Sequence, residues 1–157
     1  MPERPQERSE EWLSPSLLGQ EKLVVEEVCR IAAADGCTPE RAADLGSALA
    51  EAWLNAAEHG NGLDPTRSVR VRLALTNSLM TIRVYDEGDG AFAAAPVDGR
   101  ERDRRPPAPS SAPSDDVARG WGIPLMRELA DELSFGRDKN GFYAELRFYR
   151  TWRRNAD

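Results

Sequence analysis

The residues best suited to chemistry lie in one stretch, Leu45–Gly62 (LGSALAEAWLNAAEHGNG). Its apolar residues recur at helical spacing, which predicts a helix with one buried side. Glu51 and Asn55 are four residues apart on the other side, so their side chains lie one helical turn from each other. From Asp44 to Glu58 the chain contains no Lys or Arg. A carboxylate beside a carboxamide suits a hard, oxygen-seeking cation and a proton that must be moved, although a solvated acidic face would have the same composition.

Two glycine motifs add candidate ligand-binding positions. The first, Asp86-Glu87-Gly88-Asp89-Gly90, follows a predicted strand, where glycines let the backbone approach a flat ligand and Asp86 could accept hydrogen bonds from an exocyclic amine. The second, Gly120-Trp121-Gly122-Ile123, directly precedes a predicted helix, whose free N–H groups could bind an anion. Taken alone, either motif is a weak signal, and a pattern such as the first is more often a simple tight turn.

The segment between the two motifs differs from the rest of the chain. Residues 93–119 hold five of the eleven prolines, and Val97 and Val117 are their only large apolar residues. Such a composition cannot bury enough apolar surface to order itself, so this segment is predicted to be a long mobile loop. Its position between two glycine motifs favours a functional loop.

Periodicity predicts the elements that position these motifs. Helical spacing predicts helices over Leu17–Ala34, from Thr38-Pro39 through the stretch above, and from Ile123 to Leu133. Alternating apolar and polar residues predict strands over 69–75, 80–85 and 142–149, with a turn over Gly136–Gly141. Helices followed by hairpins, without β-α-β crossovers, predict an α+β fold, a two-layer α/β sandwich.

Length and composition limit the class of protein. The 157 residues fit one domain over 1–157, with a loose polar tail over residues 1–10. A net charge of −6 and a pI near 5.0 argue against direct nucleic-acid binding. No apolar run is long enough to span a membrane, and the N-terminus has no apolar signal core. Cys29 and Cys37 do not form a disulfide framework, so we expect a cytoplasmic protein with reduced thiols.

The three motifs together resemble a known superfamily. ExxxN on a helix, DxGxG after a strand, a mobile lid and GxG opening a helix are, in this order, similar to the Bergerat-fold (GHKL) ATPases. Within that superfamily, EAWLNAAEHGNG and RGWGIPLMRELADEL look most like the small anti-sigma factor serine/threonine kinases. The resemblance covers about Leu17 to Arg150 and implies a Bergerat fold with a mobile ATP lid over residues 93–119.

The resemblance also implies a role for each motif residue. Asn55 would bind Mg²⁺ through its amide oxygen, and Glu51 would act as general base toward a protein serine hydroxyl. Asp86 would accept a hydrogen bond from the adenine amino group of ATP, with Gly88 and Gly90 making room for the base. Gly120 and Gly122 would close over the phosphates, and Arg119 could neutralise the γ-phosphate. Such positioning and charge neutralisation are what phosphoryl transfer mainly requires.

The implied function is an anti-sigma factor that phosphorylates an anti-anti-sigma antagonist protein with ATP and Mg²⁺, and sequesters a sigma factor. The resemblance also suggests a homodimer. Two positions differ from the family pattern, because Phe142 follows Gly141 where Thr is usual and Trp121 replaces a smaller apolar residue. Two alternatives stay open: a nucleotide-binding switch that regulates a partner phosphatase without transferring phosphate, and an interaction domain with a vestigial pocket.

Overall fold

The sheet is built around a hairpin of β2 (Ser68–Leu75) and β3 (Leu79–Asp86), which confirms two of the predicted strands. The computed structural model describes residues 8–89 and 122–155, and within them the two strands pair antiparallel. Buried residues alternate with partly exposed ones along both strands, so one face of the hairpin contributes to the core.

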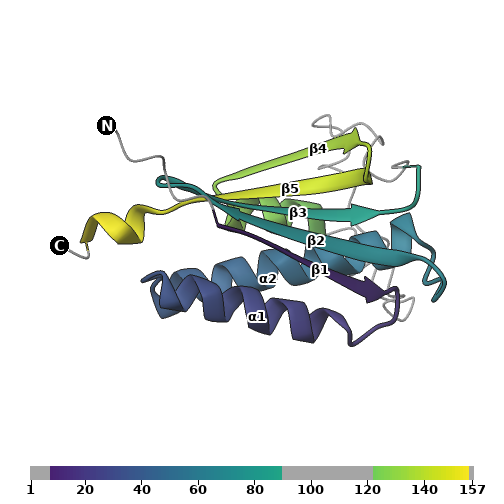
Figure 1. The fold of residues 1–157 in the computed structure, drawn as a ribbon, viewed down its shortest axis with the longest axis horizontal. Helices are drawn as coiled ribbons and strands as arrows, with labels where there is room; N and C mark the ends of the chain where they lie inside the picture. Colours follow the sequence, from purple (N-terminus) through teal and green to yellow (C-terminus); the bar gives the residue numbers. More distant parts are fainter. Residues whose placement is uncertain (1–7, 90–121, 156–157) are drawn as a thin grey trace, which may run out of the picture.

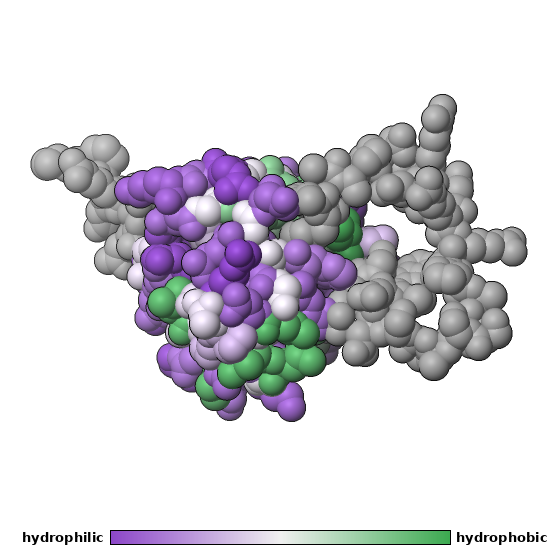
Figure 2. Space-filling view, turned by 90° about the vertical axis from the view of Figure 1, so that its right-hand side faces the viewer, coloured by the Kyte–Doolittle hydropathy of each residue, from purple (hydrophilic) through white to green (hydrophobic). Residues whose placement is uncertain are grey.

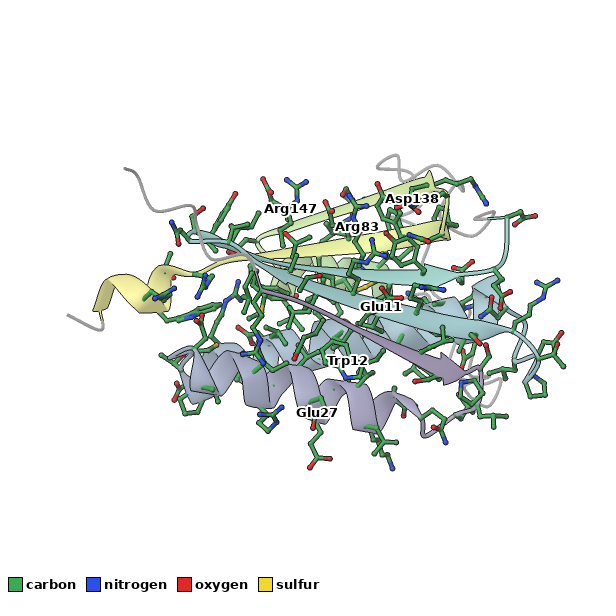
Figure 3. The ribbon with its side chains drawn as sticks, in the orientation of Figure 1. Glu11, Trp12, Glu27, Arg83, Asp138 and Arg147 are labelled. Atoms are coloured by element: carbon green, nitrogen blue, oxygen red, sulfur yellow. The ribbon has the colours of Figure 1, made fainter. Side chains whose placement is uncertain are left out.

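A strand at one edge extends this hairpin. β1 (Arg8–Pro15) pairs antiparallel with β2. The predicted tail over residues 1–10 is therefore wrong for residues 8–10, which belong to the strand, whereas residues 1–7 lie outside the described part of the chain. Consecutive residues of β1 face opposite sides of the sheet, because Trp12 packs against the core while Glu11 forms ion pairs with Arg70 and Arg72 (Figure 3).

The second hairpin corrects the sequence prediction. It consists of β4 (Glu132–Asp138) and β5 (Gly141–Tyr149), and β5 confirms the predicted final strand. β4 was missed, because the predicted helix was extended to Leu133 and a turn was placed over Gly136–Gly141. β4 lies at the other edge of the sheet, in the order β1-β2-β3-β5-β4. Leu133 and Phe135 are its only large apolar residues, too few for the sustained alternation that marks a half-buried strand.

Helices α1 (Glu21–Ala34) and α2 (Pro39–Asn55) pack against each other along one face of the sheet (Figure 1). α1 begins later than the predicted Leu17, since Gly19 has a φ of +100°, outside the helical range. α2 begins as predicted, with the Thr38 side chain accepting a hydrogen bond from the backbone N–H of Arg41 at 3.2 Å.

Three shorter helical elements complete the fold. The π-helical turn η1 (Ala56–Gly60) continues α2, α6 (Gly122–Leu129) packs against α2, and the 3₁₀ turn η2 (Thr151–Asn155) follows β5. Asp35, just after α1, anchors the last of these by accepting hydrogen bonds from Arg150 Nε at 2.8 Å and Trp152 Nε1 at 2.9 Å. The result is the predicted α+β two-layer sandwich (Figure 1).

The core lies between the helices and the sheet. Trp53 of α2 is fully buried in it. The opposite face of the sheet is ionic: Glu145, only 3% exposed, bridges Arg83 and Arg147 at 2.8 Å each (Figure 3). Within residues 8–89 and 122–155, no helix combines the length and apolar character needed to cross a membrane.

α2 and β3 finish at the same end of the molecule (Figure 1). Figure 2 looks at this end and shows a mostly hydrophilic surface with a hydrophobic area in its lower half. The connection between β1 and α1 and the first turn of α1 contribute exposed leucines, namely Leu17, Leu18 and Leu23. The first two predicted motifs therefore lie near one mixed surface, with the end of α2 on one side and the end of β3 on the other.

Candidate functional site

Glu51 and Asn55 occupy the last turns of α2, where the predicted spacing places them on one side of the helix. Glu51 is partly exposed, whereas Asn55 is only 2% exposed. Glu58, one turn further along in η1, is 9% exposed. A solvated acidic face, the alternative left open by the sequence, is therefore wrong for this end of the helix.

Asn55 is the most informative residue of the site. Neither its Oδ1 nor its Nδ2 atom has a hydrogen-bond partner among the described residues, although both atoms are buried. A buried polar group without a partner costs about 1–3 kcal/mol, and such groups are rare in folded proteins. The amide oxygen is a ligand type that Mg²⁺ accepts, so a divalent cation at this position fits the residue.

The start of α6 contacts both of these side chains. A Cβ built on Gly122 would lie 2.8 Å from Glu51 Oε2 and 3.2 Å from Asn55 Nδ2, so glycine allows this approach without displacing either side chain. The backbone at the N-terminus of α6, which carries free N–H groups, is thereby placed beside the carboxylate and the carboxamide. Gly122 is thus brought to the site, while Arg119, Gly120 and Trp121 lie outside the described residues.

Asp86 is the last residue of β3 and is 2% exposed. Burial raises the pKa of Asp86 to about 6, an effect that the Gly88 N–H bonded to Oδ1 at 2.8 Å and the nearby Arg137 partly oppose. A Cβ at Gly60 would overlap the carboxyl group, and one at Gly141, where φ is +123°, would lie 2.6 Å from the Asp86 carbonyl oxygen.

A small hollow connects Asn55 with Asp86. It is too narrow to admit a water molecule, and these two residues supply the polar side chains among the described residues that line it. The aromatic rings of Phe135 and Phe142 form one wall and stack on each other with centroids 6.2 Å apart. Phe142 pairs with Asp86 across β3 and β5, so the position that departs from the family pattern directly adjoins the buried carboxyl group.

The close approach that Gly88 permits is different from the one expected. A Cβ at Gly88 would overlap the carbonyl oxygen of Gly60, so the described contact joins the Asp86–Gly88 turn to the end of η1. Gly90, the second glycine expected to make room for a flat ligand, lies outside the described residues. The proposed segment 93–119 also lies outside them.

Three features of the site were missed by sequence reasoning. One is the π-helical turn η1, in which the Asn61 N–H donates to the carbonyl of Ala56 at 2.9 Å; π-turns inside helices are frequent at functional sites. The second is the Asn61 side chain, whose Oδ1 accepts from the Glu87 backbone N–H at 2.7 Å. The third is Arg137, whose Nη2 donates to the carbonyl of Gly88 at 3.1 Å. Arg137 had no signal, because β4 itself was not predicted.

Comparisons with known proteins identify the family of this chain. The histidine kinase-like ATPase domain family matches residues 14–148. Serine-protein kinase RsbW of Bacillus subtilis (strain 168) is 30% identical over 103 residues, which are 66% of this chain and 62% of that protein. The chain thus spans less than two thirds of that relative's length.

A solved structure shows the same fold. The crystal structure of the RsbU and RsbW domains of Rv1364c from Mycobacterium tuberculosis superposes with a TM-score of 0.60 and 18% sequence identity, over 90% of this chain and 32% of that chain. The family match includes α1, α2, β2, β3, α6 and most of β5, and with them every described residue of the candidate site. This chain therefore belongs to the histidine kinase-like ATPase domain family.

Proposed function

We propose that this protein is an ATP-dependent protein serine kinase that phosphorylates an anti-anti-sigma antagonist and, in its other state, sequesters a sigma factor. The observation that carries the proposal is the buried, unpartnered amide of Asn55 one helical turn from Glu51, with the start of α6 against both. The similarity to serine-protein kinase RsbW supports the same reaction class.

The proposed roles follow from the chemistry of each group. Glu51 would accept the proton of the serine hydroxyl while the hydroxyl oxygen bonds to the γ-phosphorus and the bond from that phosphorus to the bridging oxygen of ADP breaks. Asn55 would hold Mg²⁺, which neutralises phosphate charge when bound. Within residues 8–89 and 122–155 no three His, Cys, Asp or Glu side chains form a metal cluster, which suits a cation shared with substrate phosphates.

The remaining positions would bind the nucleotide. Asp86 would accept a hydrogen bond from the adenine amino group, and Gly88 and Gly90 would leave room beside the base. Gly122 and Gly120 would offer backbone N–H groups to the phosphates, because the N-terminus of a helix favours anions. Arg119 would add a positive charge at the γ-phosphate.

The kinase proposal is tested by phosphate transfer. The purified protein is incubated with MgCl₂, γ-labelled ATP and each anti-anti-sigma protein of its host, and phosphoserine is located by mass spectrometry. Glu51→Gln keeps the shape of the side chain but removes the base, and we expect a rate about 10²- to 10⁴-fold lower. Glu40→Gln, an exposed position in the first turn of the same helix, is the matched control. Transfer that survives Glu51→Gln would disprove the assigned base.

Partner binding is tested separately. The proposal expects the protein to bind one sigma factor and to release it when the unphosphorylated antagonist is added, measured by size-exclusion chromatography of the purified components. We also propose a homodimer, for which sedimentation equilibrium should give twice the monomer mass. Phosphorylation of an antagonist without binding of a sigma factor would support the kinase activity and refute the anti-sigma part of the proposal.

One observation favours a second function, a nucleotide-binding switch without phosphate transfer. Phe142 and Phe135 narrow the hollow beside Asp86, which would change how a base is held. Such a switch should bind MgATP in calorimetry, lose binding in Asn55→Ala, and regulate its partner equally well with Glu51→Gln. Loss of regulation in Glu51→Gln would instead support the kinase.

A further inference from the structure

We infer that Asn61 is a positioning residue that holds the Asp86–Gly88 turn in place and thereby sets the preference of the site for an adenine base. The identity of the base rests on the proposed nucleotide-binding function, whereas the positioning of the turn rests on contacts within the chain.

Asn61 is 3% exposed and uses its whole side chain in hydrogen bonds. Its Oδ1 accepts from the Glu87 backbone N–H at 2.7 Å. Its Nδ2 donates to Ser16 Oγ at 2.9 Å and to the Ser68 carbonyl at 3.0 Å. Because one partner is a donor and another is a carbonyl acceptor, a flipped amide would face unfavourable partners on both sides. The side chain therefore has one orientation, fixed by Ser16 just after β1, by β2 and by the turn.

The bond to Glu87 falls at the centre of the turn that carries Asp86. Gly88, the next residue, donates its N–H to Asp86 Oδ1 at 2.8 Å, so the backbone at Glu87 determines where the carboxyl group is held. Arg137 fixes the far side of the turn by donating to the Gly88 carbonyl at 3.1 Å. Asn61 and Arg137 thus hold consecutive residues of the turn from opposite sides.

The chain segment before Asn61 contacts Asp86 itself. Gly60 lies so close to the Asp86 carboxyl group that a Cβ would overlap it, and the Gly60 carbonyl oxygen abuts Gly88. Asn61 follows directly, which brings its side chain to the Glu87 N–H. The end of η1 therefore supplies both the surface under the carboxyl group and the hydrogen bond that holds the adjoining backbone.

Other side chains at position 61 would not reproduce this arrangement. Alanine at position 61 removes the acceptor for the Glu87 N–H. Aspartate keeps an acceptor of the same shape but places a second oxygen against the Ser68 carbonyl, so it should retain the turn while lowering the stability of the protein. Serine 16 offers the matched control, because Ser16→Ala removes one Nδ2 partner from the same buried network and leaves the Glu87 contact intact.

The experiment combines amide hydrogen exchange with nucleotide binding. In Asn61→Ala we expect the Glu87 N–H to lose protection, ATP affinity to fall about tenfold, and the preference for ATP over GTP to shrink by a similar factor. KM for ATP should rise while kcat at saturating ATP stays near wild type, since Glu51 is untouched. Ser16→Ala and Asn61→Asp should keep Glu87 protection and the ATP preference despite a lower melting temperature.

The outcomes separate this inference from the kinase proposal. The inference is overturned by any folded variant in which the Glu87 N–H exchanges freely while the ATP preference is unchanged, or by Ser16→Ala losing as much preference as Asn61→Ala. If Asn61→Ala does not fold, Asn61→Ser, which also lacks the amide oxygen that accepts from the Glu87 N–H, takes its place in this comparison. A wild-type protein that prefers ATP but phosphorylates no antagonist would refute the kinase and leave the role of Asn61 intact. One that binds no ATP would refute both.

Discussion

Replacing Asp86 by Asn should make the nucleotide-free protein more stable and at the same time remove its affinity for ATP. The substitution keeps the size of the side chain, and its Oδ1 can still accept from the Gly88 N–H. It removes a charge that is buried at the end of β3. It also places an N–H₂ group where the second carboxylate oxygen would accept from the adenine amine, so two donors would face each other.

The size of the effect follows from the pKa of Asp86. Burial raises that pKa from an ordinary 3.8 to about 6. The folded protein therefore binds the proton more tightly than the unfolded chain, and the ionised carboxyl lowers the free energy of unfolding as pH rises from about 3.8 to about 6. At about pH 8 the full penalty is about 3 kcal/mol, and at about pH 5 roughly half of it has developed. Asp86→Asn should raise the free energy of unfolding by this amount at each pH.

The assay is urea unfolding of wild type and Asp86→Asn, followed by tryptophan fluorescence at about pH 5 and pH 8 without nucleotide. The stability gain should be about 1.5 kcal/mol larger at the higher pH. Other carboxyl groups, such as Glu145 and Asp35, titrate in both proteins and cancel in the difference. Glu40→Gln, which removes an exposed charge in the first turn of α2, controls for net charge. A gain that is equal at both pH values, or a loss at both, would refute the reasoning.

Three further predictions test other parts of the structure. Gly122→Ala should reduce phosphate transfer at least tenfold with little change in melting temperature, because its Cβ would lie 2.8 Å from Glu51 Oε2; a wild-type kcat would contradict this. Asp35→Ala should lower the free energy of unfolding by about 3 kcal/mol in urea, because Arg150 and Trp152 lose their partner. Burial raises the pKa of Asp35, but the hydrogen bonds from Arg150 and Trp152 outweigh this effect, so the pKa lies below its ordinary value of 3.8. The stability difference between wild type and Asp35→Ala should therefore persist at neutral pH and disappear as pH falls below about 3.8. MgATP at a hundred times its Kd should stabilise wild type by about 3 kcal/mol in thermal unfolding but should not stabilise Asn55→Ala. An equal shift in both proteins would show that Asn55 does not contribute to MgATP binding.

Periodicity in the sequence was enough to predict most of the fold. The helix that carries Glu51, the β2–β3 hairpin and β5 are each half buried, so their burial leaves a regular pattern in the residue types. β1 and β4 lack that pattern, because they are edge strands in which few residues meet the core. β1 pairs with β2, which is distant in sequence, so local composition does not encode that pairing, and β4 pairs with the adjacent β5 but contains too few apolar residues to be recognised as a strand.

The candidate site was predicted in part for a similar reason. The pairing of Glu51 with Asn55 follows from helical spacing alone. The approach of Gly122 to both, and the burial that removes Asn55 from solvent, depend on how α6 packs against α2 and could not be read from one stretch. Arg137 and Phe135 reach the site from β4, which the sequence did not reveal.

The change of helical geometry at Ala56 explains how the two halves of the site are held together. In an α-helix the N–H of residue 61 would bond to the carbonyl of residue 57, whereas here the Asn61 N–H bonds to Ala56 and the Leu63 N–H bonds to Ala57. Each residue of an α-helix rotates the chain by about 100°, so a regular continuation would turn Asn61 away from the Glu87 N–H and Gly60 away from Asp86. Asn55, immediately before this turn, and Asp86, packed against its last residue, are therefore positioned by the same five residues. It follows that a substitution that restores regular α-helical bonding after Asn55 should disturb the adenine end of the site while leaving the spacing of Glu51 and Asn55 unchanged.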